Sequence, residues 1–281
     1  MKSHIFVLIR YSVLSRKSPQ RWTLSHQNDF EGYRAKLFDE KRLSLHEYLF
    51  ENVTIPSLDA AVARAPINVT ALVLTADTLP EPYRRKLEEI AAHREWMTIL
   101  PATETDPYLG MFEEAIRDNM LASGAADILY ATVRLDDDDA LSNDFLENLG
   151  RHMIPENAGH AVSFPAGYKM YFEGNQPVSL GRHHYPKNAQ GLTFLGKFDR
   201  KNPNTKTKTI FSFGKHSNID EKIPLILDSS TRAYVWSIHE ESDLTQRRPE
   251  RMMHQGPETS FETLEHEFTF SGEFSKKLRS G

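Results

Sequence analysis

Four apolar runs in the first half of the chain have the length and composition of buried β-strands. They read "HIFVLIR", "VTALVLTAD", "WMTILPA" and "ADILYATVRL". Between them, apolar residues recur at helical spacing in three segments: "LSLHEYLFENVTIPSLDAA", "EPYRRKLEEIAAH" and "DPYLGMFEEAIRDNMLASG". In the first of these segments, Pro56 predicts a break in the helix. Strands that alternate with helices predict an α/β fold with a largely parallel sheet flanked by helices.

Polar residues stand at the ends of three of these predicted strands. Arg10 ends the first strand, Asp77 ends the second, and four aspartates, Asp136–Asp139, follow the last. In parallel α/β sheets, ligands bind beyond the carboxyl ends of the strands. The placement of these residues therefore predicts a ligand site at this edge of the sheet.

The second half of the chain has a different pattern. Residues 155–215 are rich in aromatic residues, Gly, Asn and Lys, which predicts short antiparallel strands and long loops. One more strand is predicted in "RAYVWSIHEESD". We predict a single domain over residues 1–245, with a ligand-binding half at 1–150 and an elaborated half at 151–245. Residues 246–281 form a charged tail or a cover.

Composition narrows the possible functions. The 281 residues are 39% hydrophobic and 26% charged, with a net charge of -5, which argues against nucleic acid as the main partner. The absence of cysteine excludes disulfides, zinc-thiolate sites and a cysteine nucleophile. The apolar run Ile5–Ile9 is too short for a membrane span. We expect a cytoplasmic protein, with peripheral association at a membrane left open.

The aspartate run has three interpretations. It can be a solvated acidic turn before the helix "SNDFLENL", because carboxylates favour helix N-termini. It can be a calcium loop, although Ala140 and Leu141 stand where such a loop needs an oxygen ligand and a glycine. It can also bind a divalent cation and a diphosphate, because Mg²⁺ and Mn²⁺ accept one or two carboxylates together with phosphate oxygens.

A resemblance favours the third interpretation. "VRLDDDDAL" resembles the DxD element at a strand end of GT-A (Rossmann-like) glycosyltransferases, and the chain is similar to a family of bacterial rhamnosyltransferases. The matching segments run in order over residues 5–242: "LIRYSV", "FENVTIPSL", "LVLTADTLP", "VRLDDDDALSNDFLENL" and "YVWSIHEESD". The resemblance implies a GT-A-like sheet with a nucleotide-sugar half and an acceptor-side half.

The resemblance also assigns residues to a nucleotide-sugar donor and its metal ion. Asp136 would contact both the nucleotide and the metal, with Asp138 and Asp139 as further metal ligands. Asp77 would read the base, and Arg10 and Ser12 would lie near the base and ribose.

Two arginines have competing roles. Arg117 would face the diphosphate, unless it pairs with Glu113 or Glu114 at helical spacing. Arg134 points to the same strand face as Asp136 and can neutralise the aspartates instead of touching substrate.

His239, at the end of "YVWSIH", is the predicted histidine ligand of the metal, with His216 as its rival. His183 and His184 could line an acceptor cleft, whereas His26, His46 and His93 are predicted to be surface residues. The sequence does not identify the general base; the available carboxylates are Glu173, Asp228, Glu240 and Glu241.

The resemblance implies a glycosyltransferase that uses Mn²⁺ or Mg²⁺. The donor would be dTDP- or UDP-linked, with rhamnose as the specific expectation, and the acceptor a saccharide or glycolipid. The alternatives are a metal-dependent nucleotidyltransferase or phosphohydrolase, and a non-catalytic protein that binds carbohydrate or nucleotide. Motifs of P-loop, dinucleotide-binding, zinc-protease and serine-hydrolase enzymes are absent from the sequence.

Overall fold

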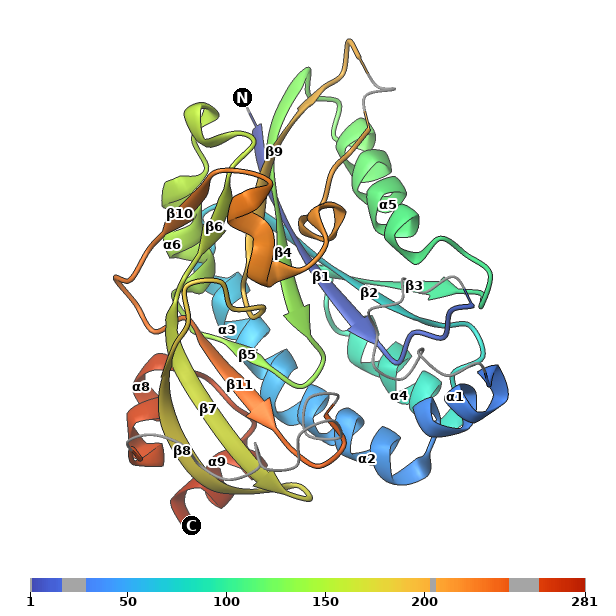
Figure 1. The fold of residues 1–281 in the computed structure, drawn as a ribbon, viewed down its shortest axis with the longest axis vertical. Helices are drawn as coiled ribbons and strands as arrows, with labels where there is room; N and C mark the ends of the chain where they lie inside the picture. The colour runs from blue at the N-terminus through green and yellow to red at the C-terminus, as the bar shows by residue number, and fades with distance from the viewer. Residues whose placement is uncertain (1, 17–28, 203–205, 243–257, 281) are drawn as a thin grey trace.

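The computed structural model describes residues 2–16, 29–202, 206–242 and 258–280. Its main sheet has seven strands in the order β10-β6-β9-β4-β1-β2-β3 (Figure 1). These strands are β1 (Lys2–Tyr11), β2 (Asn68–Ala76), β3 (Met97–Ala102), β4 (Asp127–Asp136), β6 (Ala161–Ser163), β9 (Thr193–Asp199) and β10 (Leu225–Leu227). All neighbouring pairs are parallel except those of β9 with β4 and β6. The predicted α/β fold with a largely parallel, helix-flanked sheet is confirmed.

Helices cover both faces of this sheet (Figure 1). The α-helices are α1 (Phe30–Leu37), α2 (Glu40–Leu49), α3 (Ile55–Arg64), α4 (Glu81–Ala92), α5 (Tyr108–Ala122), α6 (Phe145–His152), α8 (Leu264–Glu267) and α9 (Gly272–Ser280). The short helical turns are the π-helical η2 (Phe50–Thr54) and the 3-10 turns η3 (Pro155–Asn157), η4 (Ile210–Phe213), η5 (His216–Glu221) and η7 (Phe261–Thr263). No helix among the described residues is long and apolar enough to span a membrane.

Strand β1 shows why the sheet is buried on both sides. Its odd residues, such as Ile5 and Val7, belong to the cluster that includes residues of α3, α4 and α6. Its even residues, Phe6 and Leu8, belong to the cluster that includes residues of α5. Successive side chains of a strand point to opposite faces, so a strand covered on both sides needs an unbroken apolar run.

The predicted break at Pro56 is wrong. Helices α2 and α3 are joined through the π-helical turn η2, in which the Ile55 N–H donates to the carbonyl of Phe50. Proline has no N–H for the carbonyl four residues before it, and its ring crowds that carbonyl. That carbonyl belongs to Asn52, and it accepts instead from the N–H of Ser271, 3.0 Å away. The wider turn and this remote donor keep the chain helical.

A second sheet lies beside the first, with the order β5-β11-β7-β8 (Figure 1). Its strands are β5 (Ala140–Leu141), β7 (Ala166–Glu173), β8 (Gln176–His184) and β11 (Tyr234–Ile238). The hairpin β7–β8 is antiparallel, as predicted for this half, but β11 is parallel to β7. Val235 also pairs with Ala140, so β11 runs beside the residues that follow the aspartate run.

The C-terminal segment packs under this second sheet. Leu264, Phe268, Phe274 and Leu278 are buried in a cluster with residues of α2, η2 and the sheet. Part of the predicted tail, residues 246–257, lies outside the described residues, as does His26. The division of the chain at residues 150 and 245 stays a prediction.

Candidate metal and donor site

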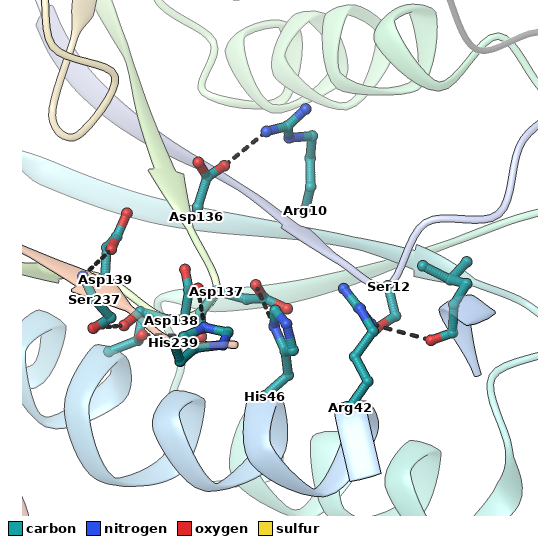
Figure 2. Close-up of polar contacts among 12 residues, drawn as sticks. Arg10, Ser12, Arg42, His46, Asp136, Asp137, Asp138, Asp139, Ser237 and His239 are labelled. Atoms are coloured by element: carbon teal, nitrogen blue, oxygen red, sulfur yellow. Dashed lines mark hydrogen bonds and ion pairs between the residues drawn. The ribbon is translucent and has the colours of Figure 1, made fainter. Parts of the chain in front are cut away.

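The four aspartates follow β4 in a tight turn, in which the Asp139 N–H donates to the carbonyl of Asp136 at 3.3 Å. Asp137, Asp138 and Asp139 are buried, so the run is not a solvated acidic turn. A strand precedes the run, where a calcium-binding loop would follow a helix. Each carboxylate meets a different partner, which is how adjacent acidic groups are tolerated inside the protein (Figure 2).

Asp136 lies between two arginines. In the parallel register of β1 and β4, Arg10 stands directly beside Asp136, and its Nη2 lies 2.7 Å from the carboxylate. Arg134 contacts the other carboxylate oxygen at 3.0 Å. Burial alone would raise the pKa of Asp136, but the guanidinium groups of Arg134 and Arg10 outweigh it and hold the pKa below its usual range. Asp136 is therefore ionised. Arg134 lies where it can neutralise this carboxylate, which is one of the two roles that the sequence left open for it.

Asp137 holds a histidine of α2. Its Oδ1 lies 3.1 Å from Nδ1 of His46, and its backbone carbonyl accepts from the Thr54 hydroxyl of η2 at 3.1 Å. Burial raises the pKa of Asp137 to about 7 and lowers the pKa of His46, whose ring is therefore neutral. The prediction that His46 is a surface residue is wrong, because its exposed fraction is only 5%. His93 is exposed as predicted.

Asp138 meets two histidines that come from distant parts of the chain. Its Oδ2 lies 2.8 Å from Nε2 of His239 at the end of β11. One potential ligand atom from each of His46, Asp138 and His239 lies within 4.8 Å of the others. Nε2 of His46 is buried and has no hydrogen-bond partner among the residues that the structure describes. A neutral imidazole with a free nitrogen beside a carboxylate suits a divalent transition-metal ion, so these three residues fit a metal.

Asp139 makes contacts within the protein. Its carboxylate accepts from the Ser237 N–H at 2.8 Å and from the Gln190 side-chain amide at 3.0 Å. Burial, followed by the charges of Asp138 and Asp136, raises its pKa. The structure thus brings together Asp138 and His239 of the predicted ligand set. Asp136 and Asp139, which were also predicted as ligands, are not part of this group, whereas His46, which was not predicted, belongs to it.

Beside the histidines, a buried cation lies near the end of β1. Arg42, one turn before His46 on α2, donates from Nη1 to the Ser12 hydroxyl at 3.0 Å and to the Leu37 carbonyl at 3.1 Å (Figure 2). Its exposed fraction is 8%, and it forms no ion pair with any described residue. Ser12 has a backbone φ of 48°, a left-handed conformation that is uncommon for a residue other than glycine. A buried, unpaired guanidinium is a natural contact for an anion.

These groups share one cavity of about 650 Å³. One part of its lining consists of Arg10, Ser12, Arg42, His46, Arg134 and all four aspartates, together with the apolar Val13, Tyr33 and Leu37. The second sheet and its neighbouring loops add Lys169, His183, Tyr185 and Trp236, and η5 adds His216.

Other predicted site residues lie elsewhere. Asp77 is exposed in the turn after β2, and its N–H donates to the Ala102 carbonyl at 2.9 Å. Arg117 lies 3.7 Å from both Glu114 and Asp118. It therefore forms an ion pair along its own helix, which was the alternative to a contact with the diphosphate. Neither Asp77 nor Arg117 is among the residues that line the cavity, and His184 is also outside it.

Sequence reasoning missed His46, Arg42 and Trp236. The available signal was the spacing of Arg42 and His46, which places two side chains capable of binding phosphate and metal on one helix face. His46 is buried beside Asp137 and His239, which come from later parts of the chain that a local pattern does not show.

Comparison with known proteins gives one family and several distant structures. No curated protein matches the chain. Similar solved structures include one titled "Putative Glucose-1-Phosphate Thymidylyltransferase from Bacillus anthracis", at 10% identity and a TM-score of 0.41, covering 91% of this chain and 98% of that one. Another is 4-diphosphocytidyl-2C-methyl-D-erythritol synthase, at 11% identity and a TM-score of 0.37, covering 83% and 91%.

The family match extends over most of the chain. Residues 4–251 match the family described as "Putative rhamnosyl transferase", a range that holds the aspartate run, both histidines of the candidate metal group and the cavity. The predicted resemblance to this family is confirmed. The chain belongs to the family described as "Putative rhamnosyl transferase".

Proposed function

We propose that this protein is a divalent-metal-dependent glycosyltransferase. It moves a sugar, with rhamnose as our specific expectation, from a dTDP- or UDP-linked donor to a saccharide or glycolipid acceptor. Family membership supports glycosyl transfer. The observation that carries the metal dependence is the group formed by His46, Asp138 and His239, because His46 and Asp138 of this group line a cavity large enough for a small ligand.

In this proposal, His46, Asp138 and His239 hold the ion, and Asp137 orients the ring of His46 through its Nδ1. The bound ion supplies Lewis-acid stabilisation of the negative charge on the leaving diphosphate. Two imidazoles and one carboxylate favour Mn²⁺ over Mg²⁺, which prefers oxygen ligands.

Other residues of the cavity bind and orient the donor. Arg42 is a buried cation, one helical turn from His46, with no ion-pair partner in the described part of the chain, so it takes a phosphate of the donor. Val13, Tyr33 and Leu37 give that part of the cavity an apolar surface for the flat face of a base. Arg10 and Arg134 keep Asp136 ionised and fixed as an acceptor for donor hydroxyl or base N–H groups.

The test is a thermal-shift screen of nucleoside diphosphates and nucleotide sugars with and without Mn²⁺. At 100 times its dissociation constant, a ligand stabilises the folded state by about 2.7 kcal/mol. For a chain of this size we expect the melting temperature to rise by roughly 5–10 °C. The rise should require Mn²⁺ and should disappear in His239→Ala. If no common nucleotide shifts the wild-type melting temperature, the proposed function is wrong.

Product analysis separates this function from its alternatives. A glycosyltransferase releases a nucleoside diphosphate and forms a glycosylated acceptor. A nucleotidyltransferase would release pyrophosphate, and a phosphohydrolase would release phosphate. A non-catalytic binding protein would bind the donor in the screen without slow hydrolysis during long incubation with Mn²⁺.

A further inference from the structure

The second sheet gives the cavity an aromatic wall, formed by His183 of β8, Tyr185 after it and Trp236 of β11. The His183 ring centroid lies 5.6 Å from that of Trp236 and 6.4 Å from that of Tyr185. Lys169 of β7 places its Nζ 5.2 Å from the centroid of the Trp236 ring. None of these rings is fully buried, so they present an apolar but accessible surface to the cavity. Such a surface suits the C–H face of a sugar ring.

Within this wall, the hydrogen bonds of His183 define which ring nitrogen carries the proton. Nδ1 of His183 lies 2.7 Å from the hydroxyl oxygen of Tyr234. The same hydroxyl donates to the carbonyl of Pro165 at 3.2 Å. A tyrosine hydroxyl has one proton, and a carbonyl can only accept. Both hydrogen bonds therefore form together only when Nδ1–H donates to Tyr234, which leaves the lone pair on Nε2.

The position of Tyr234 is fixed by packing. The residue is buried, and a Cβ added to Gly167 would lie 2.6 Å from its ring. Glycine at position 167 therefore makes room for the tyrosine that holds His183. Burial, followed by the charges of Lys169 and His184, lowers the pKa of His183 to about 4, so the ring is neutral at pH 7. That basicity is close to that of a free aspartate, a residue type that also serves as a general base.

Outside the aspartate run, the carboxylates that the sequence offered as general bases are engaged or remote. Glu241 lines the cavity but lies 3.2 Å from Nζ of Lys41, which also contacts Glu240 at 3.3 Å. Asp228 lies 2.7 Å from a ring nitrogen of His152, and Glu173 is exposed at the end of β7. Asp228 and Glu173 are both outside the cavity lining.

His216 is the remaining rival. It lines the cavity, and its Nδ1 lies 2.6 Å from the Lys187 carbonyl, so its Nε2 also carries a lone pair. Its charged neighbours, however, are Arg134 and Asp136 of the donor side. It is not part of the aromatic wall, and we place it near the donor.

We propose that the aromatic wall is the acceptor-sugar subsite and that Nε2 of His183 is the general base of the transfer. This inference rests on the proposed function. The acceptor hydroxyl oxygen forms a bond to the anomeric carbon of the donor sugar while the bond from that carbon to the diphosphate oxygen breaks. The electron pair of the broken bond stays on the diphosphate, and the hydroxyl proton moves to Nε2 of His183. Tyr234 is a positioning residue that holds the ring in the required tautomer.

The tautomer can be tested without any substrate. A long-range ¹H–¹⁵N spectrum of protein labelled at histidine distinguishes a protonated from an unprotonated ring nitrogen, and His183→Gln assigns the signal. We expect a neutral ring with the proton on Nδ1 at pH 7. Tyr234→Phe should abolish that preference. A proton on Nε2 in the wild-type protein would overturn the assignment of the base.

Kinetics tests the role itself, with dTDP-L-rhamnose and UDP-sugars as donors, methyl glycosides as acceptors and Mn²⁺ present. General-base catalysis contributes roughly 10²–10⁴-fold, so His183→Gln should lower kcat by that factor. Its dissociation constant for the nucleoside diphosphate should stay within threefold of wild type. His184→Gln, an exposed neighbour outside the cavity, is the matched control and should keep wild-type turnover.

The outcomes distinguish a failure of the proposed function from a failure of the assignment of His183 as the general base. If the wild-type protein binds no nucleotide sugar, the proposed function fails and this inference fails with it. If the donor binds and turns over but His183→Gln keeps normal kcat, only the assignment of the base is wrong. The same conclusion follows if His216→Gln, rather than His183→Gln, removes turnover while leaving donor binding intact.

Discussion

Two substitutions distinguish the candidate metal ligands that the structure brings together from those expected from the sequence. His46→Ala removes a ring that lies with Asp138 and His239 in the candidate metal group. Loss of an outer-shell partner of a metal site already costs roughly 10–100-fold in affinity. Loss of a ligand should therefore weaken Mn²⁺ binding by more than about 100-fold, which is about 2.7 kcal/mol.

Asp139→Asn is the contrasting change. The asparagine oxygen can still accept from the Ser237 N–H, and the Gln190 amide can rotate to accept from the new NH₂ group. Burial, followed by the charges of Asp138 and Asp136, raises the pKa of Asp139, so this environment disfavours a charge and accommodates a neutral amide. We expect Mn²⁺ affinity to change by less than about fivefold and stability by less than about 1 kcal/mol.

Isothermal titration with Mn²⁺ measures both affinities, and the melting temperature of each metal-free variant shows whether it is folded. If Asp139→Asn loses as much affinity as His46→Ala, the carboxylate belongs to the metal site. If His46→Ala is folded and binds Mn²⁺ like the wild type, the group of two histidines and one aspartate is not the site.

Two further predictions concern stability away from the cavity. Phe274→Ala empties a fully buried position in the cluster under the second sheet, so it should cost about 3–5 kcal/mol and lower the melting temperature by roughly 6–20 °C. Val178→Ala, at a 47% exposed position of β8, should change stability by less than about 0.5 kcal/mol, and equal effects would contradict the packing described. Burial lowers the pKa of His4 to about 4 from 6.5, so the unfolded chain binds the extra proton and stability falls as pH drops from 6.5 towards 4. His4→Gln should therefore lose less stability between pH 7 and pH 5 in urea titrations than the wild type, and an equal loss would refute this explanation.

The parts of the fold that depend on local pattern were predictable. The apolar runs of β1 and β4 indicate strands buried on both faces, and parallel pairing brings the ends of such strands to one edge. That reasoning is enough to place Arg10 and Asp136 side by side, as the register shows. The end of β11 was also recognised, and His239 lies beside Asp138.

The parts that depend on remote packing were not predictable. His46 stands on a helix whose sequence alternates charged and apolar residues without a clear buried face. Its ring is buried beside the carboxylate of Asp137 and the ring of His239, which come from distant parts of the chain. The continuity of the helix through Pro56 likewise depends on Ser271, more than 200 positions away. None of these partners can be identified from the residues near the helix itself.

The contact between Asp138 and His239 can form only late in the synthesis of the chain. The two residues are 101 positions apart, and Ser237, which donates to Asp139, is 98 positions from it. At a synthesis rate of roughly 5–20 residues per second, the aspartates precede these partners from the ribosome by about 5–20 s. During that interval Asp138 lacks the imidazole of His239, and Asp139 lacks the N–H of Ser237, because neither partner has been synthesised. If our proposal is right, the complete metal group of His46, Asp138 and His239 can therefore form only when synthesis has passed β11.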